Sequence, residues 1–286
     1  MSKPKLNKKL LKHFIKKGLE EDVKDGDHTS LACIPPKQKS SARLLVKDEG
    51  VISGIAIAKE IFTYLDPKTK MDIRISDGEK VKYGDIAFYL ECNSQALLKG
   101  ERLALNTMQR LSGISTLSSK FQEEVKGLDV KILDTRKTTP LLRFLEKWAV
   151  AIGGCTNYRD GLYDWIMIKD NHIDAAGSIT KAIRKTNKYL KKKGLDLGIT
   201  VEVRNILELE EVLAEGNITR IMLDNFEIPD IKKALEKING RFETEVSGGV
   251  RLNVVRSLAE TGVNYISVGA LTHSAHSLDL SLKIMK

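Results

Sequence analysis

The sequence predicts an α/β protein with two domains: an N-terminal α/β domain of helices and a small sheet, followed by an irregular (β/α) barrel with fewer than eight strands. Three observations predict this fold. The chain has 286 residues, of which 42% are hydrophobic, so it can bury a large core without disulfides. Short β-like runs separated by turn signals occupy residues 40–92. Beyond Gly127, short apolar strands alternate with helical segments at the spacing of βα units.

The N-terminal domain begins with an amphipathic helix over residues 6–19, where leucine, isoleucine and phenylalanine recur at i, i+4 spacing. Residues 97–109 predict a second helix, on which Arg102 and Asn106 share one strip. We place the domains at 1–113 and 114–274, and we expect residues 275–286 to pack back on the N-terminal domain.

The barrel is predicted from six short strands, nearly all of which end in a polar residue or a glycine. They cover residues 130–134, 165–169, 199–203, 221–224, 242–247 and 265–269. The segments between them are helical in pattern, including 137–152, 206–215 and 252–260. In barrels of parallel strands the catalytic residues occupy the carboxyl ends of the strands, so the strand-end residues are the candidate site.

Composition argues against several classes of protein. The net charge of +9 falls to +2 once the seven lysines of residues 1–17 are set aside, so basicity belongs mainly to one solvated helix, and nucleic acid is not an expected partner. A second lysine cluster at residues 188–193 has the same interpretation. No apolar run approaches the length of roughly 18 residues that a membrane span needs. Three dispersed cysteines and a lysine-rich start predict a cytoplasmic protein.

The strand ends carry cations, carboxylates and glycines. The first strand leads into Asp134-Thr135-Arg136-Lys137, and Arg159 follows a glycine pair. Later strand ends supply Lys169, Glu202, Asp224, Ser247-Gly248-Gly249 and Gly269, with His273 just beyond. This combination suits a polyanionic substrate bound with a divalent metal, and the glycines of the last two strands suit a phosphate group. The chain has no GxGxxG fingerprint, Walker A loop or Ser-His-Asp elbow, which argues against Rossmann, P-loop and hydrolase functions.

Several motifs together resemble the quinolinate phosphoribosyltransferase family. They are ERLALNTMQRLSGIST (101–116), ILDTRKTTPLLRFLEKWAVAIGGCTNYRDGLYDWIMIKDNHI (132–173), VEVRN (201–205), IMLDN (221–225), VSGGV (246–250) and YISVGALTHS (265–274). The resemblance runs from about residue 18 to the C-terminus. It implies conversion of quinolinate and phosphoribosyl pyrophosphate to nicotinate mononucleotide, pyrophosphate and CO2 in NAD biosynthesis. It also implies Mg²⁺, no organic cofactor, and at least a homodimer.

The resemblance also implies roles for individual residues. Arg136 and Arg159 would bind the quinolinate carboxylates through bidentate contacts, and Arg102 would reach the pocket from the neighbouring subunit. Lys137 and Lys169 would neutralise quinolinate and pyrophosphate, while Glu202 and Asp224 would hold the ribose hydroxyls or Mg²⁺, largely through substrate or water. The 5′-phosphate would lie on the remaining positions, Ser247, Gly248, Gly249, Gly269 and His273.

Two positions depart from the family pattern. Tyr158 replaces the histidine that usually precedes the arginine, and Thr200 stands where relatives often have a second glutamate. A phenol donates a hydrogen bond but cannot become cationic, so we expect activity with altered substrate affinity or pH dependence.

Three alternatives stay open at this stage. The first is a phosphoribosyltransferase-like paralogue associated with molybdenum transport, and the second is nicotinate phosphoribosyltransferase. The third is a non-catalytic barrel that binds phosphate or nucleic acid.

Overall fold

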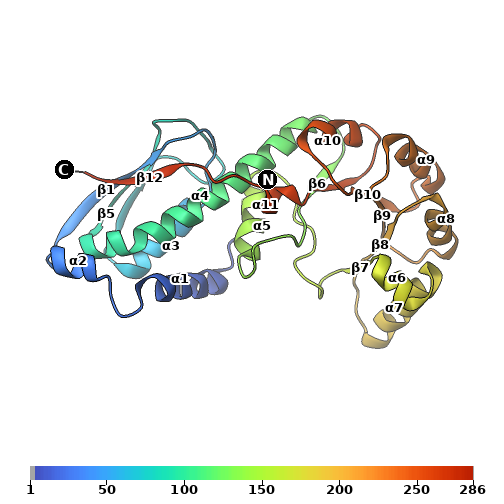
Figure 1. The fold of residues 1–286 in the computed structure, drawn as a ribbon, viewed down its shortest axis with the longest axis horizontal. Helices are drawn as coiled ribbons and strands as arrows, with labels where there is room; N and C mark the ends of the chain where they lie inside the picture. The colour runs from blue at the N-terminus through green and yellow to red at the C-terminus, as the bar shows by residue number, and fades with distance from the viewer. Residues whose placement is uncertain (1–3, 286) are drawn as a thin grey trace. The chain divides into compact units, whose positions relative to one another are not determined.

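The computed structural model describes residues 4–285 and has two compact units. The first unit contains the chain up to Ser119, the segment Thr139–Gly154 and the chain from Ser274 onward. The second contains Lys120–Thr138 and Cys155–His273. Both units mix helices and sheet, as the sequence predicts (Figure 1).

The first unit is built on an antiparallel sheet with strand order β12-β1-β5-β3. Its strands are β1 (Lys39–Val46), β3 (Lys70–Ile73), β5 (Ile86–Asn93) and β12 (Leu280–Ile284). The short strands β2 (Gly50–Val51) and β4 (Lys80–Val81) form a separate pair. The C-terminal strand β12 pairs with β1 from Ala42↔Ile284 to Val46↔Leu280, so the end of the chain completes this N-terminal sheet.

Helices α1 (Lys8–Val23), α2 (His28–Cys33), α3 (Ile55–Leu65), α4 (Ser94–Glu124) and α5 (Arg143–Ile152) accompany that sheet. Asn7 caps α1 by accepting hydrogen bonds from the Lys9 and Leu10 N–H groups, which fixes the start of the predicted amphipathic helix. Helix α3 packs closely on α4, since a Cβ atom on Gly100 would lie 2.8 Å from a methyl group of Leu65. Phe62 of α3 lies at this contact and is buried, and Phe88 of β5 is buried in the core of the same unit.

Helix α4 is longer than the sequence suggested, because it continues without a break from Ser94 to Glu124 rather than ending near residue 109. Its second half carries buried serines that bond to neighbouring backbone. Ser112 Oγ donates to the Ser53 carbonyl, and Ser115 Oγ donates to the Ala149 carbonyl. At Gly113 a Cβ would lie 1.9 Å from the His276 carbonyl oxygen, so only glycine allows this approach.

The predicted helix over 137–152 is wrong in its first third, because α5 begins only at Arg143. Pro140 disfavours a helical conformation for the residue before it, and Leu141 has φ of 66°, outside the right-handed region. Glu146 secures the non-helical segment by accepting hydrogen bonds from the Thr139 N–H and hydroxyl. Arg110 pairs with the same buried carboxylate at 3.0 Å.

The second unit contains a six-stranded parallel sheet of order β6-β11-β10-β9-β8-β7. The strands are β6 (Lys131–Leu133), β7 (Ile166–Ile168), β8 (Ile199–Val203), β9 (Arg220–Asp224), β10 (Glu243–Ser247) and β11 (Tyr265–Ser267). All six predicted strands are therefore present, which confirms an irregular barrel-type sheet with fewer than eight strands. Within residues 4–285, β6 and β7 do not pair with each other, and a single bridge joins Leu133 to Thr156 beside that opening.

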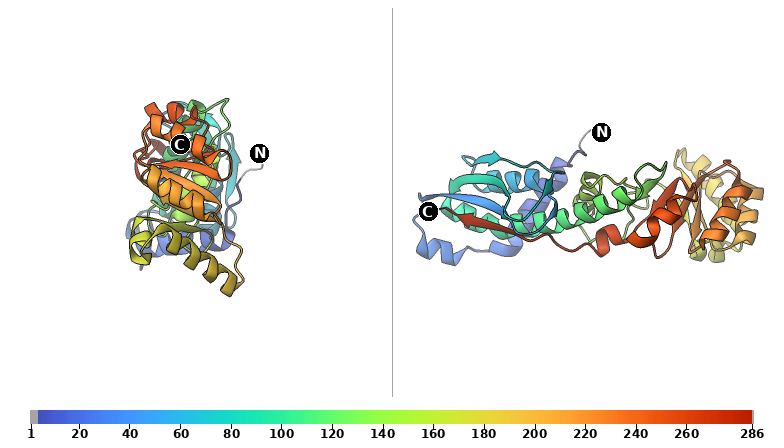
Figure 2. Two further views of the ribbon diagram at one scale, coloured as in Figure 1. Left: turned by 90° about the vertical axis from the view of Figure 1, so that its right-hand side faces the viewer. Right: turned by 90° about the horizontal axis from the view of Figure 1, so that it is seen from above.

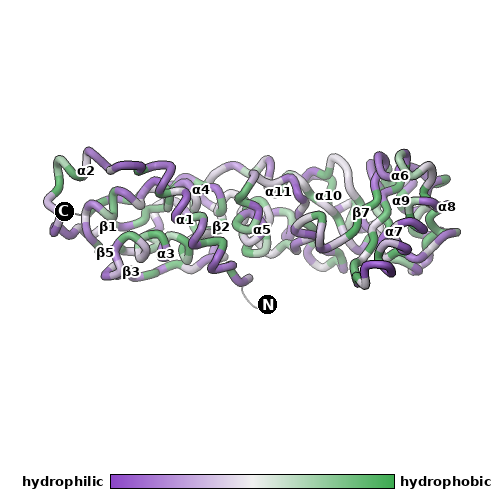
Figure 3. The backbone as a smooth tube through the Cα atoms, turned by 90° about the horizontal axis from the view of Figure 1, so that it is seen from below, coloured by the Kyte–Doolittle hydropathy of each residue, from purple (hydrophilic) through white to green (hydrophobic). Residues whose placement is uncertain are grey.

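The strands of this sheet follow an arc with helices on its outer side (Figures 1 and 2). The helices are α6 (Asp170–Ala176), α7 (Ile179–Lys193), α8 (Ile206–Glu215), α9 (Ile228–Ile238), α10 (Leu252–Ala259) and α11 (Ala270–His273). Lys188 and Lys191–Lys193 are exposed on α7, much of which is coloured as hydrophilic in Figure 3, as expected for a solvated helix face. No helix in residues 4–285 has both the length and the apolar character needed to cross a membrane.

Candidate active site

The predicted site residues of the second unit lie at the carboxyl ends of its parallel strands. Asp224 ends β9 and lies opposite Ser247, which ends β10. Glu202 lies on the adjacent strand β8 opposite Met222, two residues before Asp224. Side chains two residues apart on a strand point to the same face, so these three polar groups share one face of the sheet.

Lys169 and Glu202 form an ion pair, with 2.5 Å between Nζ and Oε2. The Glu202 side chain is 9% exposed and the Lys169 side chain 42% exposed, so the carboxylate is the buried partner. Lys169 is also the N-cap of α6, and its N–H donates to Nδ1 of His172 at 3.0 Å. His172 therefore has a local capping role, which fixes the backbone that carries Lys169.

Asp224 is held by two neighbours. Ser247 Oγ donates to Oδ1 at 2.7 Å, and Asn225 Nδ2 donates to Oδ2 at 2.8 Å. Asn225 has φ of 56°, a left-handed conformation that asparagine tolerates. At Gly248, with φ of 97°, a Cβ atom would lie 2.1 Å from Asn225 Oδ1. The first glycine of the pair is therefore required by both its conformation and its contact with Asn225.

A second group of predicted residues lies near the paired strands β11 and β6. It contains Lys137, Gly269 and His273. A Cβ atom on Gly269 would be 3.1 Å from Lys137 Cδ and 3.2 Å from His273 Nε2. The Thr272 hydroxyl donates to the Lys137 carbonyl at 2.7 Å and fixes this backbone. Lys137 and His273, from two distant segments of the chain, thus meet at Gly269, which has no side chain.

Two arginines beside β6, Arg136 and Arg159, are close enough for their positive charges to interact. Burial lowers the pKa of Arg159, and the positive charge of Arg136 lowers it further. Arg136 Nε is buried and has no hydrogen-bond partner among residues 4–285. Because an unpaired buried donor near a like charge is costly, this pair of arginines suits an anion with more than one charge.

Tyr158 contacts the sheet through both its backbone and its side chain. Its N–H donates to Oδ1 of the fully buried Asp134 at 2.8 Å. Its hydroxyl lies 2.7 Å from Thr200 Oγ1, and burial raises the pKa of the phenol well above its usual range. Tyr158 therefore stays neutral across the physiological range, and its hydroxyl is engaged by the sheet.

Arg102 belongs to the other unit, on α4. It is exposed, and its Nη1 lies 3.5 Å from Asn106 Oδ1, so the two residues share the helix face that the sequence predicted. Gly249 has φ of 57° and no atom within 4 Å of the position of a Cβ, so its surroundings are open.

Some contributors were missed by sequence reasoning. Asn225 contacts both Asp224 and Gly248, and its position directly after a strand end was the available signal. Arg220 and Glu245 are buried and paired at 3.1 Å inside the sheet, two or four residues before the strand ends. Arg220 is four residues before Asp224, and Glu245 is two residues before Ser247. This even spacing was the signal that their side chains face the same side of the sheet as Asp224 and Ser247.

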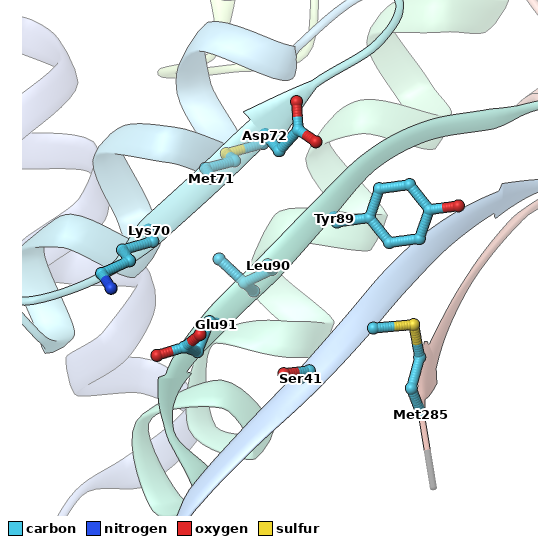
Figure 4. Close-up of a pocket in the computed structure, with 8 residues that line it drawn as sticks. All are labelled: Ser41, Lys70, Met71, Asp72, Tyr89, Leu90, Glu91 and Met285. Atoms are coloured by element: carbon cyan, nitrogen blue, oxygen red, sulfur yellow. The ribbon is translucent and has the colours of Figure 1, made fainter.

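Among residues 4–285, no group of three or more His, Cys, Asp or Glu side chains is arranged to hold a metal ion. A pocket of about 300 Å³ lies on the sheet of the first unit and is drawn in Figure 4. It is lined by Ser41, Lys70, Met71, Asp72, Tyr89, Leu90, Glu91 and Met285. None of the predicted site residues lines this pocket.

Two family models match the chain: the N-terminal domain of quinolinate phosphoribosyl transferase over residues 27–112 and its C-terminal domain over 114–283. The chain belongs to the quinolinate phosphoribosyltransferase family. Quinolinate phosphoribosyltransferase [decarboxylating] 1b of Nicotiana tabacum is 46% identical over 96% of this chain and 82% of the relative. A probable nicotinate-nucleotide pyrophosphorylase [carboxylating] of Bacillus subtilis is 44% identical over 97% and 93%.

A solved structure has the same fold. NadC from Streptococcus pyogenes superposes with a TM-score of 0.92 at 35% identity, covering 99% of this chain and all of that one. The two matched family models meet at residues 112 and 114, inside the continuous helix α4. These findings do not favour the molybdenum-transport alternative.

Proposed function

We propose that this chain transfers the phosphoribosyl group of phosphoribosyl pyrophosphate to quinolinate at the strand-end cluster of its six-stranded sheet. The chain is a decarboxylating quinolinate phosphoribosyltransferase of NAD biosynthesis, a pentosyltransferase. Its products are nicotinate mononucleotide, pyrophosphate and CO2. The observation that carries the location of the site is the gathering of two arginines, two lysines and two carboxylates at these strand ends.

Quinolinate is a dicarboxylate, so we assign its two carboxylates to Arg136 and Arg159. The Arg136 Nε without a partner and the lowered pKa of Arg159 support this assignment, because a bound dianion would supply the missing acceptor and offset the like charges. We assign to Tyr158 a supporting place beside them. Arg102 would complete the pocket from a second copy of the chain in a homodimer or higher homo-oligomer.

The phosphoribosyl donor would lie along the neighbouring strands. Glu202 and Asp224 would bind the ribose hydroxyls and stabilise positive charge that develops at the anomeric carbon. Ser247 and the glycines Gly248, Gly249 and Gly269 would bind the 5′-phosphate through the hydroxyl and the backbone. Lys137, with His273 beside it, and Lys169 would neutralise the pyrophosphate.

Mg²⁺ is compatible with this arrangement. The ion prefers oxygen ligands and is commonly held by one or two carboxylates together with substrate phosphates rather than by a full protein cage. Glu202 and Asp224 are the carboxylates that would hold it, alongside the pyrophosphate oxygens. When bound, it would neutralise charge on the departing pyrophosphate. We expect no organic cofactor.

The reaction has two chemical steps. In the first, the lone pair of the quinolinate ring nitrogen forms a bond to the anomeric carbon as the carbon–oxygen bond to pyrophosphate breaks. In the second, the bond between the ring and the adjacent carboxylate breaks, and CO2 leaves. The electron pair stays on the ring beside the positive nitrogen until that carbon takes a proton. Lys137 and Lys169 would stabilise the negative charge on the leaving group.

Cytoplasmic location remains our expectation from the free cysteines Cys33, Cys92 and Cys155. The domain division at residues 113 and 114 likewise remains a proposal.

The test is CO2 release from carboxyl-labelled quinolinate with phosphoribosyl pyrophosphate, with and without Mg²⁺. Nicotinate is the comparison substrate, followed by pyrophosphate release because its carboxylate stays on the ring. Mg²⁺-dependent CO2 release together with nicotinate mononucleotide is the expected result. The Lys137→Ala variant should abolish turnover, and a folded wild-type chain that releases no CO2 would reject the proposed reaction.

A further inference from the structure

A buried polar cluster lies within the six-stranded sheet, on the same face as the proposed catalytic carboxylates. Thr200 precedes Glu202 by two residues on β8, and Glu245 precedes Ser247 by two on β10. Side chains separated by two residues face the same side of a strand, so Thr200 and Glu245 lie on the face that carries the site. The mechanism above assigns no role to Thr200 or to Arg220, which lies opposite Thr200 on β9.

The Thr200 hydroxyl links two aromatic side chains. It lies 2.7 Å from the Tyr158 hydroxyl and accepts a hydrogen bond from Trp165 Nε1 at 2.8 Å. Thr200 is fully buried, so water does not compete for these bonds. The two rings themselves contact edge to face, with centroids 6.1 Å apart.

Those two aromatic residues flank Arg159. Tyr158 precedes it in the chain, and the Trp165 carbonyl lies 3.4 Å from Arg159 Nη1. The other guanidinium nitrogen, Nη2, lies 3.5 Å from the Met167 sulfur. Both of these contacts of Arg159 are long, whereas Tyr158 and Trp165 lie within 2.7 Å and 2.8 Å of the Thr200 hydroxyl.

Arg220 contacts the same two rings. Its guanidinium carbon lies 5.0 Å from the Tyr158 ring centroid and 5.5 Å from that of Trp165, with Tyr265 at 3.6 Å. Glu245 pairs with it at 3.1 Å and is fully buried. The negative charge of Glu245 also acts on Arg159, whose pKa it raises against the larger effects of burial and Arg136.

We propose that Thr200 is a positioning residue for quinolinate binding: its single hydroxyl fixes Tyr158 and Trp165, and these two hold the Arg159 guanidinium in place for a substrate carboxylate. The proposal rests on the proposed function in one respect, the assignment of Arg159 to quinolinate. It also gives a physical reason why the two departures from the family pattern, Tyr158 and Thr200, occur together in this chain. They are hydrogen-bonded to each other, as a neutral pair.

The test compares Thr200→Val, which removes the hydroxyl at similar size, with Thr200→Ser, which keeps it. Loss of one buried hydrogen-bonding group should raise KM for quinolinate by about five- to tenfold in Thr200→Val. KM for phosphoribosyl pyrophosphate and kcat should stay within about twofold of wild type, because we assign Arg159 to the binding of quinolinate only. Thr200→Ser should remain near wild type.

Thr244→Val is the matched control. Thr244 is also buried in this sheet, and its Oγ1 makes two hydrogen bonds, both to Asn264. A general loss of stability would appear in both valine variants, whereas a rise in quinolinate KM should appear only in Thr200→Val. Equal KM values for Thr200→Val and wild type, or a parallel rise for both substrates, would overturn the proposal.

A spectroscopic measurement tests the same link without catalysis. The chain has two tryptophans, so Trp148→Phe leaves Trp165 as its single indole. In that background Thr200→Val should shift Trp165 emission to shorter wavelength, and Thr200→Ser should not. Quinolinate affinity measured by calorimetry should fall in the same variant. If wild type fails to release CO2, the proposed function is rejected, while unchanged emission and unchanged affinity would reject the role of Thr200.

Discussion

Lys169 Nζ and Glu202 Oε2 lie 2.5 Å apart, which ties the carboxyl end of β7 to that of β8. The pair joins a partly exposed cation to a buried carboxylate, so removal of the lysine leaves the carboxylate buried without this partner. This arrangement allows the lysine to be tested separately from the ion pair.

Lys169→Met should lower kcat/KM by about a hundredfold or more, because it removes a cation that we assign to pyrophosphate. It should also cost about 1–3 kcal/mol of stability, since Glu202 is left buried without its partner. The double variant Lys169→Met/Glu202→Gln should regain stability but not activity, as measured by thermal unfolding and turnover. Lys233→Met is the control, because it breaks a pair with Asp230 in which both side chains are exposed, and it should change neither. Activity of Lys169→Met near the wild-type level would contradict the assignment.

Gly248→Ala and Gly249→Ala form a matched pair. The first introduces a Cβ 2.1 Å from Asn225 Oδ1 at φ of 97°, so it should displace the Asn225–Asp224 contact and lower kcat/KM by about tenfold to a hundredfold. The second meets open space and should cost only the conformational strain of about 1–2 kcal/mol. Steady-state kinetics with varied phosphoribosyl pyrophosphate and thermal unfolding measure both effects. Equal kinetic losses in the two variants would show that the Asn225 contact is unimportant.

Glu245 should make stability depend on pH in a defined direction. Burial raises the pKa of this carboxyl in the folded protein, against the opposing effects of the Ser267 hydrogen bond, Arg220 and Tyr158. A raised folded pKa stabilises the fold fully below the unfolded value of about 4.3 and loses that contribution as pH rises through the folded pKa. Relative to Glu245→Gln, wild type should therefore become less stable as pH rises above about 4.3. Parallel urea-unfolding curves for the two proteins between acid and neutral pH would contradict this.

Tyr158→His should introduce a titration that wild type lacks. The phenol of Tyr158 has a raised pKa and remains neutral, whereas an imidazole ordinarily titrates near about 6.5. The variant should show a new change in quinolinate KM between acid and neutral pH, seen in a pH profile of kcat/KM. Identical profiles for the two enzymes would mean that this position does not influence substrate binding.

Arg102→Ala should leave the chain folded and weaken quinolinate binding, because Arg102 is exposed on α4. If it acts on a second copy, hybrids of Arg102→Ala and Lys169→Met chains should recover part of the activity that each homo-oligomer lacks. The measurement is turnover after co-refolding of differently tagged chains. Hybrids that are isolated and remain inactive would place the whole pocket within one chain.

The six parallel strands and their terminal residues could be predicted because each strand is a short apolar run followed by a polar residue or a glycine. The same local signals failed at Pro140 and Leu141, where the predicted helix begins six residues late. Helix α4 was underestimated because its serines look like surface residues, yet they pack against neighbouring backbone.

Strand alternation indicates the face of Arg220 and Glu245, but the contacts within the interior cluster could not be predicted from it. Arg220 looks like a surface charge at the start of a strand, and its contacts come from four other places in the sequence: Tyr158, Trp165, the Glu243–Glu245 segment and Tyr265. The spacing of the strands along the sequence also does not show whether the two outer strands of the sheet pair with each other. The opening between β6 and β7 is a property of the assembled sheet.

The pairing of β12 with β1 has a consequence during synthesis on the ribosome. The ladder from Ala42↔Ile284 to Val46↔Leu280 joins two segments that are far apart in the sequence, so β1 emerges long before its partner is made. Until then its unpaired N–H and C=O groups form an open edge that another chain can bind. Synthesis of Leu280–Ile284 therefore allows this edge to close, and a product that stops before Leu280 would leave it open.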